Sequence, residues 1–274
     1  MSLAKIVKKT FGRKTKKQIV QGDFIPRDEI VGNVVLHQNF ASKHSGKERP
    51  VLVWMPSVYK VNKRKRFPVL YMHDGQNIMD PRTAYIGVDW RVDEWAEKLI
   101  AENKTEPFIV VGIYNTPDRL EEYSDSPKGT AYRRFIIEEL KPFIDSKYRT
   151  LPDRENTAIM GSSMGGLCSL LTIWKEHEIF SKAACLSSSF YYGNDNIFNV
   201  IKNTDHPLPL KVYIDSGEDG KQDAQKMFRL LSERGNIIGD DFDYFYDIGA
   251  QHTESAWAAR LERPLRFLFP PKRK

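Results

Sequence analysis

Short apolar segments alternate with longer amphipathic segments along most of the chain. The short segments are rich in Val, Ile, Phe and Tyr, which is typical of buried strands. They cover residues 31–37, 49–55, 67–73, 108–114, 157–161, 183–187, 210–215 and 241–247. Between them, apolar residues recur at helical spacing. The helices predicted from this spacing cover residues 89–101, 129–147, 164–176, 221–235 and 254–268.

This order of elements predicts an α/β protein. No helix separates the first two strands, so we expect the sheet to start antiparallel. The later alternation of strands and helices predicts a mainly parallel, eight-stranded sheet with helices on both faces. Pro142 should kink or end the helix predicted at 129–147. The irregular segments 74–88, 115–128 and 188–209 each follow a strand, where loops of parallel sheets build binding sites.

Composition and charge limit the function further. The chain has 274 residues, of which 41% are apolar, so it can bury a large core. No linker divides it, and we expect one domain over residues 23–270 between basic tails at 1–22 and 271–274. The net charge is +6, but residues 1–17 and 272–274 hold ten of the 42 bases, which leaves 32 bases against 36 acids in between. We interpret the tails as solvated ends and expect no nucleic-acid partner.

The apolar segments and the cysteines of the chain indicate in which cellular compartment we expect the protein. No apolar run approaches the roughly 18 residues that a membrane-spanning helix needs. The first thirty residues lack the apolar stretch of a secretion signal. Cys168 and Cys185 lie among apolar residues, as buried thiols do. We therefore expect a cytoplasmic protein with no membrane partner.

The sharpest motif is GSSMGG at residues 161–166, between a predicted strand and a predicted helix. A serine nucleophile on a tight strand-to-helix turn needs small neighbours, because strand and helix approach each other closely there. Ser162 is the rival of Ser163, but only Ser163 has glycine two residues before and two residues after it. We expect Ser163 to be a nucleophile, with the N-terminus of the following helix behind it.

A serine hydroxyl needs a base, and the base needs a carboxylate. Three histidines follow Ser163, namely His177, His206 and His252. His252 comes directly after the last predicted strand, from where a base reaches back over the sheet, so we expect it to be the base.

The acid should leave the preceding strand. Asp215, Glu218 and Asp219 all lie there, in the sequence YIDSGEDG. We favour Asp219, which lies on the loop. Glu218 remains the alternative acid, since a shift of the turn by one residue would make Glu218 face His252 in place of Asp219. Asp215 is a weaker candidate because it is still within the strand pattern.

Two backbone N–H groups should bind the negative oxygen that forms in such a reaction. One belongs to Met164, the residue after the nucleophile. The other should come from the loop HDGQN at residues 73–77, and Gln76 is the expected donor. His73 and Asp74 have no third metal ligand at a supporting spacing, so we interpret His73 as structural.

Together these residues resemble the putative esterase family of α/β-hydrolases. This family includes esterase D-like S-formylglutathione hydrolases, enterochelin esterases, feruloyl esterases and mycolyltransferases. The segments that carry the resemblance are residues 67–77 (FPVLYMHDGQN), 119–123 (RLEEY), 135–148, 161–167 and His252 with the helix after it.

The length of the chain leaves little room for a large lid domain, and the resemblance implies an α/β-hydrolase fold. It also implies a serine esterase that uses no metal and no cofactor. Ser163, His252 and either Asp219 or Glu218 match the triad, Gln76 and Met164 match the oxyanion donors, and Arg119 matches a residue that shapes the wall of the site.

The expected substrate is a small-molecule ester. Trp90, Tyr191 and Trp257 are candidates for an aromatic pocket, together with Arg119, and the alternative is that such aromatic side chains are ordinary core residues. Esters on plant-wall sugars, siderophore esters and thioesters such as S-formylglutathione all fit such a pocket. The missing secretion signal weakens the mycolyltransferase and secreted feruloyl esterase interpretations. The alternative of another class is a non-catalytic binding protein on the same fold.

Overall fold

The computed structural model describes residues 23–24, 30–204, 209–235 and 237–272. The predicted basic tail at 1–22 lies outside the described residues, as do the last two residues of the chain and His206. None of the helices in the described ranges combines the length and apolar composition needed to cross a bilayer.

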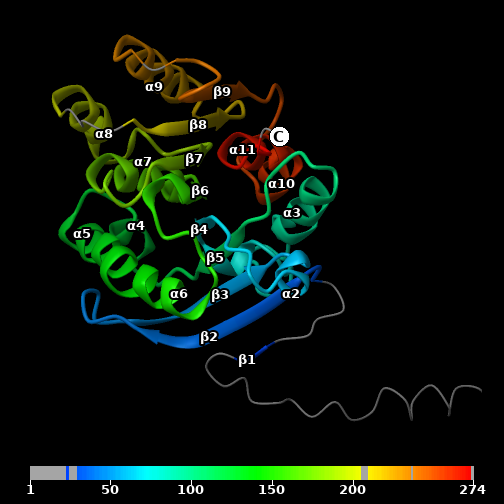
Figure 1. Cartoon of the computed structure of the whole chain (residues 1–274). Helices are drawn as coiled ribbons and strands as arrows, with labels where there is room; N and C mark the ends of the chain where they lie inside the picture. The colour runs from blue at the N-terminus through cyan, green and yellow to red at the C-terminus, as the bar shows by residue number, and fades with distance from the viewer. Residues whose placement is uncertain (1–22, 25–29, 205–208, 236, 273–274) are drawn as a thin grey trace, which may run out of the picture.

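The described residues form a nine-stranded sheet, with the strands in the order β1-β2-β3-β5-β4-β6-β7-β8-β9 (Figure 1). The eight predicted strands are all present, and the two-residue strand β1 is added at one edge. Their bounds are β1 Asp23–Phe24, β2 Asn33–Ala41, β3 Glu48–Met55, β4 Val69–His73, β5 Ile109–Ile113, β6 Thr157–Ser162, β7 Lys182–Leu186, β8 Lys211–Ser216 and β9 Phe242–Tyr246.

Strand directions agree with the expectation from the sequence. The pairs β1–β2, β2–β3 and β3–β5 are antiparallel. From β5 to β9 every neighbouring pair is parallel. The carboxyl ends of β4 to β9 therefore meet at one edge of the sheet, and this edge holds the site described below.

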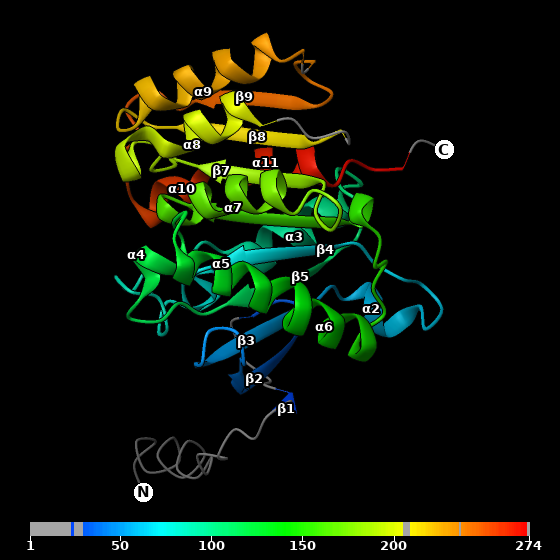
Figure 2. The ribbon, with the colours of Figure 1, turned by 90° about the vertical axis from the view of Figure 1, so that its left-hand side faces the viewer.

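Helices cover both faces of the sheet, which lies between them in Figure 1. One face carries α3 (Val92–Ala101), α10 (Glu254–Arg260) and α11 (Glu262–Leu268). The other carries α5 (Pro127–Arg134), α6 (Lys141–Lys147), α7 (Met164–Lys175), α8 (Tyr192–Asn203) and α9 (Lys221–Glu233), which lie in front of the strands in Figure 2. Short helices α2 (Val58–Val61) and α4 (Arg119–Glu122) and two 3₁₀ turns, Gly75–Asn77 and Arg154–Asn156, lie in the connections.

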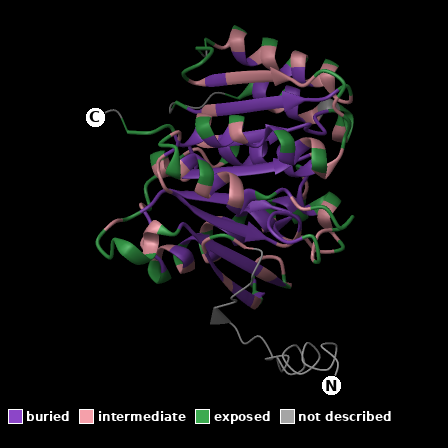
Figure 3. Cartoon of the chain, turned by 90° about the vertical axis from the view of Figure 1, so that its right-hand side faces the viewer, coloured by how far each residue is buried: buried purple, intermediate pink, exposed green. Residues whose placement is uncertain are grey.

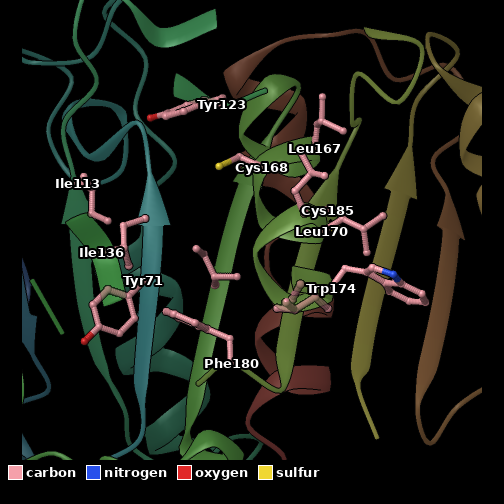
Figure 4. Packing of buried hydrophobic residues seen from close by; sticks show 14 of the residues in the cluster. Tyr71, Ile113, Tyr123, Ile136, Leu167, Cys168, Leu170, Trp174, Phe180 and Cys185 are labelled. Carbon is pink, nitrogen blue, oxygen red and sulfur yellow. The ribbon is translucent and has the colours of Figure 1, made fainter. Parts of the chain in front are cut away.

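The two faces have separate cores because successive side chains of a strand point to opposite sides. In β4, Val69 and Tyr71 pack toward α5–α9, whereas Leu70 and Met72 pack toward α3, α10 and α11. The strands are buried along most of their length, while the outer faces of the helices are exposed (Figure 3). Cys168 and Cys185 are buried, unpaired thiols in the first of these cores, as predicted (Figure 4).

The structure differs from two local predictions, one of them only in part. Pro142 was expected to kink or end its helix, and it does not end it: Pro127–Lys147 is helical throughout, with a π-helical segment at Phe135–Leu140 just before the proline. The wider π turn shifts the hydrogen-bond register, which accommodates a residue that has no N–H to donate. The segment 188–209 is not wholly irregular, since it contains α8. Gly and Asn give α8 a low intrinsic helix propensity, and burial of Ile197 and Ile201 stabilises it instead.

Candidate active site

The site is organised around the sharp turn from β6 into α7. Ser163 occupies this turn with φ 55° and ψ −123°, a backbone conformation that is costly for a residue with a side chain. The surrounding contacts hold it there: its N–H donates to the carbonyl of Leu186 at 2.9 Å, and its carbonyl accepts from Gly166 and Leu167 in α7. The tight strand-to-helix turn expected at Ser163 is thus present.

The three glycines of the motif are required by close approach. A Cβ on Gly161 would lie 2.7 Å from the carbonyl carbon of Gly165, and a Cβ on Gly165 would lie 3.2 Å from the Cβ of His73. A Cβ on Gly166 would overlap the hydroxyl of Ser188. Strand β6, helix α7 and the loop after β7 can therefore pack this closely only without side chains at these positions.

His252 lies in the connection between β9 and α10, and its Nδ1 is hydrogen-bonded to Oδ2 of Asp219. Its ring also packs edge-on against Trp257, with 4.9 Å between the ring centroids. The partner and the packing fix the ring plane, and Nε2 is left to act on a neighbour.

The other two carboxylates have different partners. Glu218 accepts from the Tyr246 hydroxyl at 2.6 Å and from the Gly249 N–H at 2.8 Å, and these bonds lower its pKa. Asp215 is buried and accepts from Arg260 at 2.9 Å. Of the three acids considered from the sequence, only Asp219 contacts His252, and Glu218 anchors the loop that carries it.

Ser163 and His252 line the same cavity, but no hydrogen bond joins them in the described part of the chain. Instead, Oγ of Ser163 lies 3.1 Å from Oγ of Ser189, in the loop after β7. Nucleophile and base are often loosely paired before substrate binds. His177 lies at the end of α7, with Nδ1 3.4 Å from the carbonyl of Trp174, and is not in the cavity lining.

The loop after β4 forms the opposite wall. Gln76 lies in the 3₁₀ turn Gly75–Asn77, its carbonyl accepts from Thr83 at 2.6 Å, and its side-chain Oε1 accepts from the Asn115 N–H at 3.2 Å. Gln76 and Met164 each lie in the first turn of a helix, where N–H groups have no intrahelical acceptor. Gln76 lines the cavity over Ser163, whereas Met164 is buried and is not among the lining residues.

Asp74 anchors that loop. It has a positive φ of 55°, is buried, and accepts from Arg119 through two bonds, Nε to Oδ1 at 2.8 Å and Nη2 to Oδ2 at 2.7 Å. Asn115 donates a third bond at 2.7 Å. Burial alone would raise the pKa of Asp74, but the bonds and charge of Arg119 outweigh burial and hold the pKa below its ordinary value.

His73 is structural, as the sequence suggested. Its Nδ1 is hydrogen-bonded to the Tyr132 hydroxyl at 2.9 Å, and burial lowers its pKa to about 3, so the ring is neutral. Both side chains of this pair have protein partners, Asp74 in Arg119 and Asn115, and His73 in Tyr132.

The cavity over Ser163 has a volume of about 490 Å³. Its wall combines amides and hydroxyls with two aromatic rings, and the lining residues are Asp74, Gln76, Asn77, Thr83, Tyr85, Asn115, Thr116, Arg119, Ser162, Ser163, His252, Glu254 and Trp257. The loops 74–88 and 115–128 thus supply much of the site, as expected, whereas 188–209 supplies no lining residue.

Two predicted pocket residues are not in that lining. Trp90 is buried in the core, where its ring centroid lies 5.6 Å from that of Trp257, so it supports a wall residue from behind. Tyr191 is 60% exposed just before α8. Both were proposed from loop position, which does not tell which way a side chain points. Arg119 and Trp257 do line the cavity.

Sequence reasoning missed the role of Asp74 and overlooked Ser189. A signal existed for each. Asp74 directly follows β4, and a carboxylate there can meet Arg119 from the loop after the adjacent strand β5. Ser189 ends a run of three serines directly after β7, the parallel neighbour of β6.

The chain resembles known proteins over most of its length. A family model described as Putative esterase matches residues 42–268. The endo-1,4-beta-xylanase/feruloyl esterase of Xylanibacter ruminicola is 32% identical over 248 residues, which is 89% of this chain and 32% of the relative. The chain therefore spans about a third of the length of that relative.

Solved structures support the same fold. A ferulic acid esterase is 22% identical with a TM-score of 0.70, over 86% of this chain and 97% of that chain. The enterobactin esterase of Shigella flexneri is 17% identical with a TM-score of 0.71, over 91% of this chain and 60% of that chain. These likenesses confirm the α/β-hydrolase fold. With the match of the family model over residues 42–268, they lead to one conclusion: the chain belongs to the putative esterase family.

Proposed function

We propose that the protein is a serine esterase in which Ser163, His252 and Asp219 form the catalytic triad. The observation that carries this proposal is the hydrogen bond between His252 and Asp219 at the cavity in which Ser163 occupies a strained turn. Asp219 fixes the tautomer of the imidazole and stabilises its charged form, which is the role of the acid in such a triad.

The reaction starts when His252 takes the proton of Ser163 and the serine oxygen attacks the ester carbonyl. The N–H groups of Gln76 and Met164 bind the oxyanion that forms. His252 then gives its proton to the leaving alcohol, and an acyl-enzyme on Ser163 remains. Water, deprotonated by His252, releases the acid and restores the hydroxyl.

The substrate that fits best is an aromatic acid ester linked to a sugar. Tyr85 and Trp257 provide aromatic surface, while Asn77 and Asn115 provide amides, a combination suited to a ring and to hydroxyl groups. The name of the Xylanibacter ruminicola relative, which includes feruloyl esterase, points the same way. Siderophore esters and the thioester S-formylglutathione are the alternatives, and a non-catalytic binding protein is the alternative of another class.

Substitution of the nucleophile tests the proposal. We expect Ser163→Ala to abolish hydrolysis of p-nitrophenyl acetate and methyl ferulate, with a loss of about 10⁶-fold in kcat. Ser162→Ala is the matched control, because Ser162 is adjacent, buried and part of the cavity lining. It should keep most of the activity. Hydrolysis by Ser163→Ala at the wild-type rate would eliminate the proposal. If the wild type hydrolyses none of the three compounds p-nitrophenyl acetate, methyl ferulate and S-formylglutathione, this would favour a non-catalytic binding protein.

A second pair of variants tests the acid. Asp219→Asn removes the carboxylate that contacts His252, and we expect kcat to fall about 10⁴-fold. Glu218→Gln keeps an acceptor for Tyr246 and for the Gly249 N–H, so it should be nearly as active as the wild type. The reverse ranking of these two variants would assign the acid to Glu218.

A further inference from the structure

Ser189 is a second buried hydroxyl at the nucleophile, and the mechanism above gives it no task. Its Oγ lies 3.1 Å from Oγ of Ser163, and the residue is 3% exposed. Buried hydroxyl groups are nearly always hydrogen-bonded. Within the described part of the chain, the contact with Ser163 is the one hydrogen bond of the Ser189 side chain.

The backbone holds the two hydroxyls together. The Ser163 N–H donates to the Leu186 carbonyl at 2.9 Å, and the Ser189 N–H donates to the Ser163 carbonyl at 3.0 Å. The backbone of Ser163 is therefore bonded through its N–H to the end of β7 and through its carbonyl to the loop that follows. The fixed backbone thus brings the two side chains close enough for their hydroxyls to meet.

The loop after β7 is in turn held by bonds of Ser187 to Asp215 and Arg260. Ser187 has a positive φ of 40°, and its N–H donates to the backbone carbonyl of Asp215 at 3.0 Å and to its Oδ1 at 3.1 Å. Its Oγ accepts from Arg260 at 2.8 Å, and Arg260 is ion-paired with the buried Asp215. This network joins the ends of β7 and β8 to α10, so it keeps Ser189 from moving away from Ser163.

We propose that Ser189 is a further catalytic residue. Its hydroxyl donates a hydrogen bond to the oxygen of Ser163 while Ser163 transfers its own proton to His252. The inference rests on the proposed function. Ser163 has one hydrogen, so when this points to His252 the bond with Ser189 must be donated by Ser189. The direction of the hydrogen bonds then runs from Ser189 through Ser163 to His252.

Such a bond favours the step in which the nucleophile attacks. As the proton leaves Ser163, its oxygen gains negative charge, and a hydrogen bond to a charged acceptor is about twice as strong as one to a neutral acceptor. After attack the same oxygen belongs to an ester and is a weaker acceptor. The contact is thus stronger in the transition state than before or after it, which is the condition for catalysis. Ser189 keeps its hydrogen throughout.

Ser189→Ala tests the proposal against the matched variant Ser188→Ala. Ser188 is adjacent and equally buried, at 3% exposure, but its hydroxyl has no hydrogen-bond partner among the described residues. We expect Ser189→Ala to lower the rate of acylation by p-nitrophenyl acetate, and the rate of labelling by a fluorophosphonate, by about 10- to 100-fold with an unchanged KM. Ser188→Ala should be acylated at the wild-type rate, and Ser189→Thr, which keeps a hydroxyl, should regain most of the rate.

Equal acylation rates for Ser189→Ala and Ser188→Ala would overturn the proposal, as would a slow Ser189→Ala with no recovery in Ser189→Thr. If Ser189→Ala does not fold, Ser189→Cys replaces it, since a thiol is a weaker hydrogen-bond donor of similar size. A wild-type acylation rate in Ser189→Cys would also contradict the catalytic role of Ser189. The proposed function fails separately, through an active Ser163→Ala. An inactive Ser163→Ala with a fully active Ser189→Ala leaves the triad standing and removes only Ser189.

Discussion

Removal of the Arg119 guanidinium should show how strongly the loop after β4 depends on one ion pair. Arg119→Ala removes both bonds to Asp74, which lie at 2.8 and 2.7 Å, and leaves a buried carboxylate with the amide of Asn115 as its nearest remaining donor. Breaking a buried pair costs about 3–5 kcal/mol, since the remaining charge is uncompensated. Arg119 itself is 27% exposed and Asn115 remains, so we expect the lower end, about 3 kcal/mol.

The loss should depend on pH, with a sign that follows from Asp74. Its pKa in the folded wild type lies below the ordinary value of 3.8, so the pair stabilises the protein above that pH, and this contribution is lost as the pH falls through the lower folded value. In Arg119→Ala, burial is no longer outweighed, and the pKa of Asp74 should rise above 3.8. The variant then binds a proton more readily than the wild type, and its deficit should shrink between pH 7 and pH 4.

Urea unfolding at pH 7 and pH 4.5 measures this difference, and thermal unfolding at pH 7 should show a drop of about 6–12 °C. Arg134→Ala is the control, because Arg134 forms an exposed pair with Glu138 at 2.8 Å and its loss should matter much less. Activity should fall as well, since Gln76 is on the loop that Asp74 anchors. A deficit below about 1 kcal/mol at pH 7, or one that does not change with pH, would refute the reasoning.

Three other substitutions are informative. Gly166→Ala should destabilise the protein by about 1–3 kcal/mol in thermal unfolding, since the new Cβ overlaps the hydroxyl of Ser188, and Ser188→Ala in the same chain should recover part of the loss. His37 is buried, and burial, helped by the charge of Lys147, lowers its pKa to about 4. Unfolded chains bind that proton below about pH 6.5, so His37 by itself should lower the stability by about 2 kcal/mol between pH 6.5 and pH 4. His37→Gln should make this part of the urea-unfolding profile less steep, and the slope that remains should include the share of His73. Tyr85→Ala should raise KM for methyl ferulate about 5-fold and leave KM for ethyl acetate unchanged, because an exposed ring at the cavity can stack on an aromatic acid and not on an ester without a ring. Equal effects on both esters would argue against that contact.

Much of the fold follows from local patterns. Each buried strand is a short apolar run, so β2 to β9 were found within a few residues of their bounds. Helices with a clear apolar stripe, such as α7 and α9, were found as well. Helix α8 was missed because Gly193 and its asparagines are poor helix formers, and its stability comes from packing of Ile197 and Ile201 on other elements.

In the candidate site, too, some residues could be predicted from the sequence and one choice could not. The place of Ser163 was predictable, since the tight turn leaves a mark in the sequence: glycines at 161, 165 and 166 where side chains would collide. The place of His252 followed from its position after the last strand. The choice between Asp219 and Glu218 was not predictable, because adjacent residues of a loop point in different directions, and the structure pairs Asp219 with His252 and Glu218 with Tyr246.

By itself, then, the sequence determined the order of strands and helices along the chain, the parallel sheet and the strand ends at which the candidate catalytic side chains lie. These depend on hydrophobic spacing and on steric limits between near neighbours, which act over a few residues. Tertiary structure alone decided the contacts between distant side chains: Asp74 with Arg119, Asp215 with Arg260, and Ser189 with Ser163. Such contacts depend on side-chain direction and burial, which exist only once separate segments have packed together.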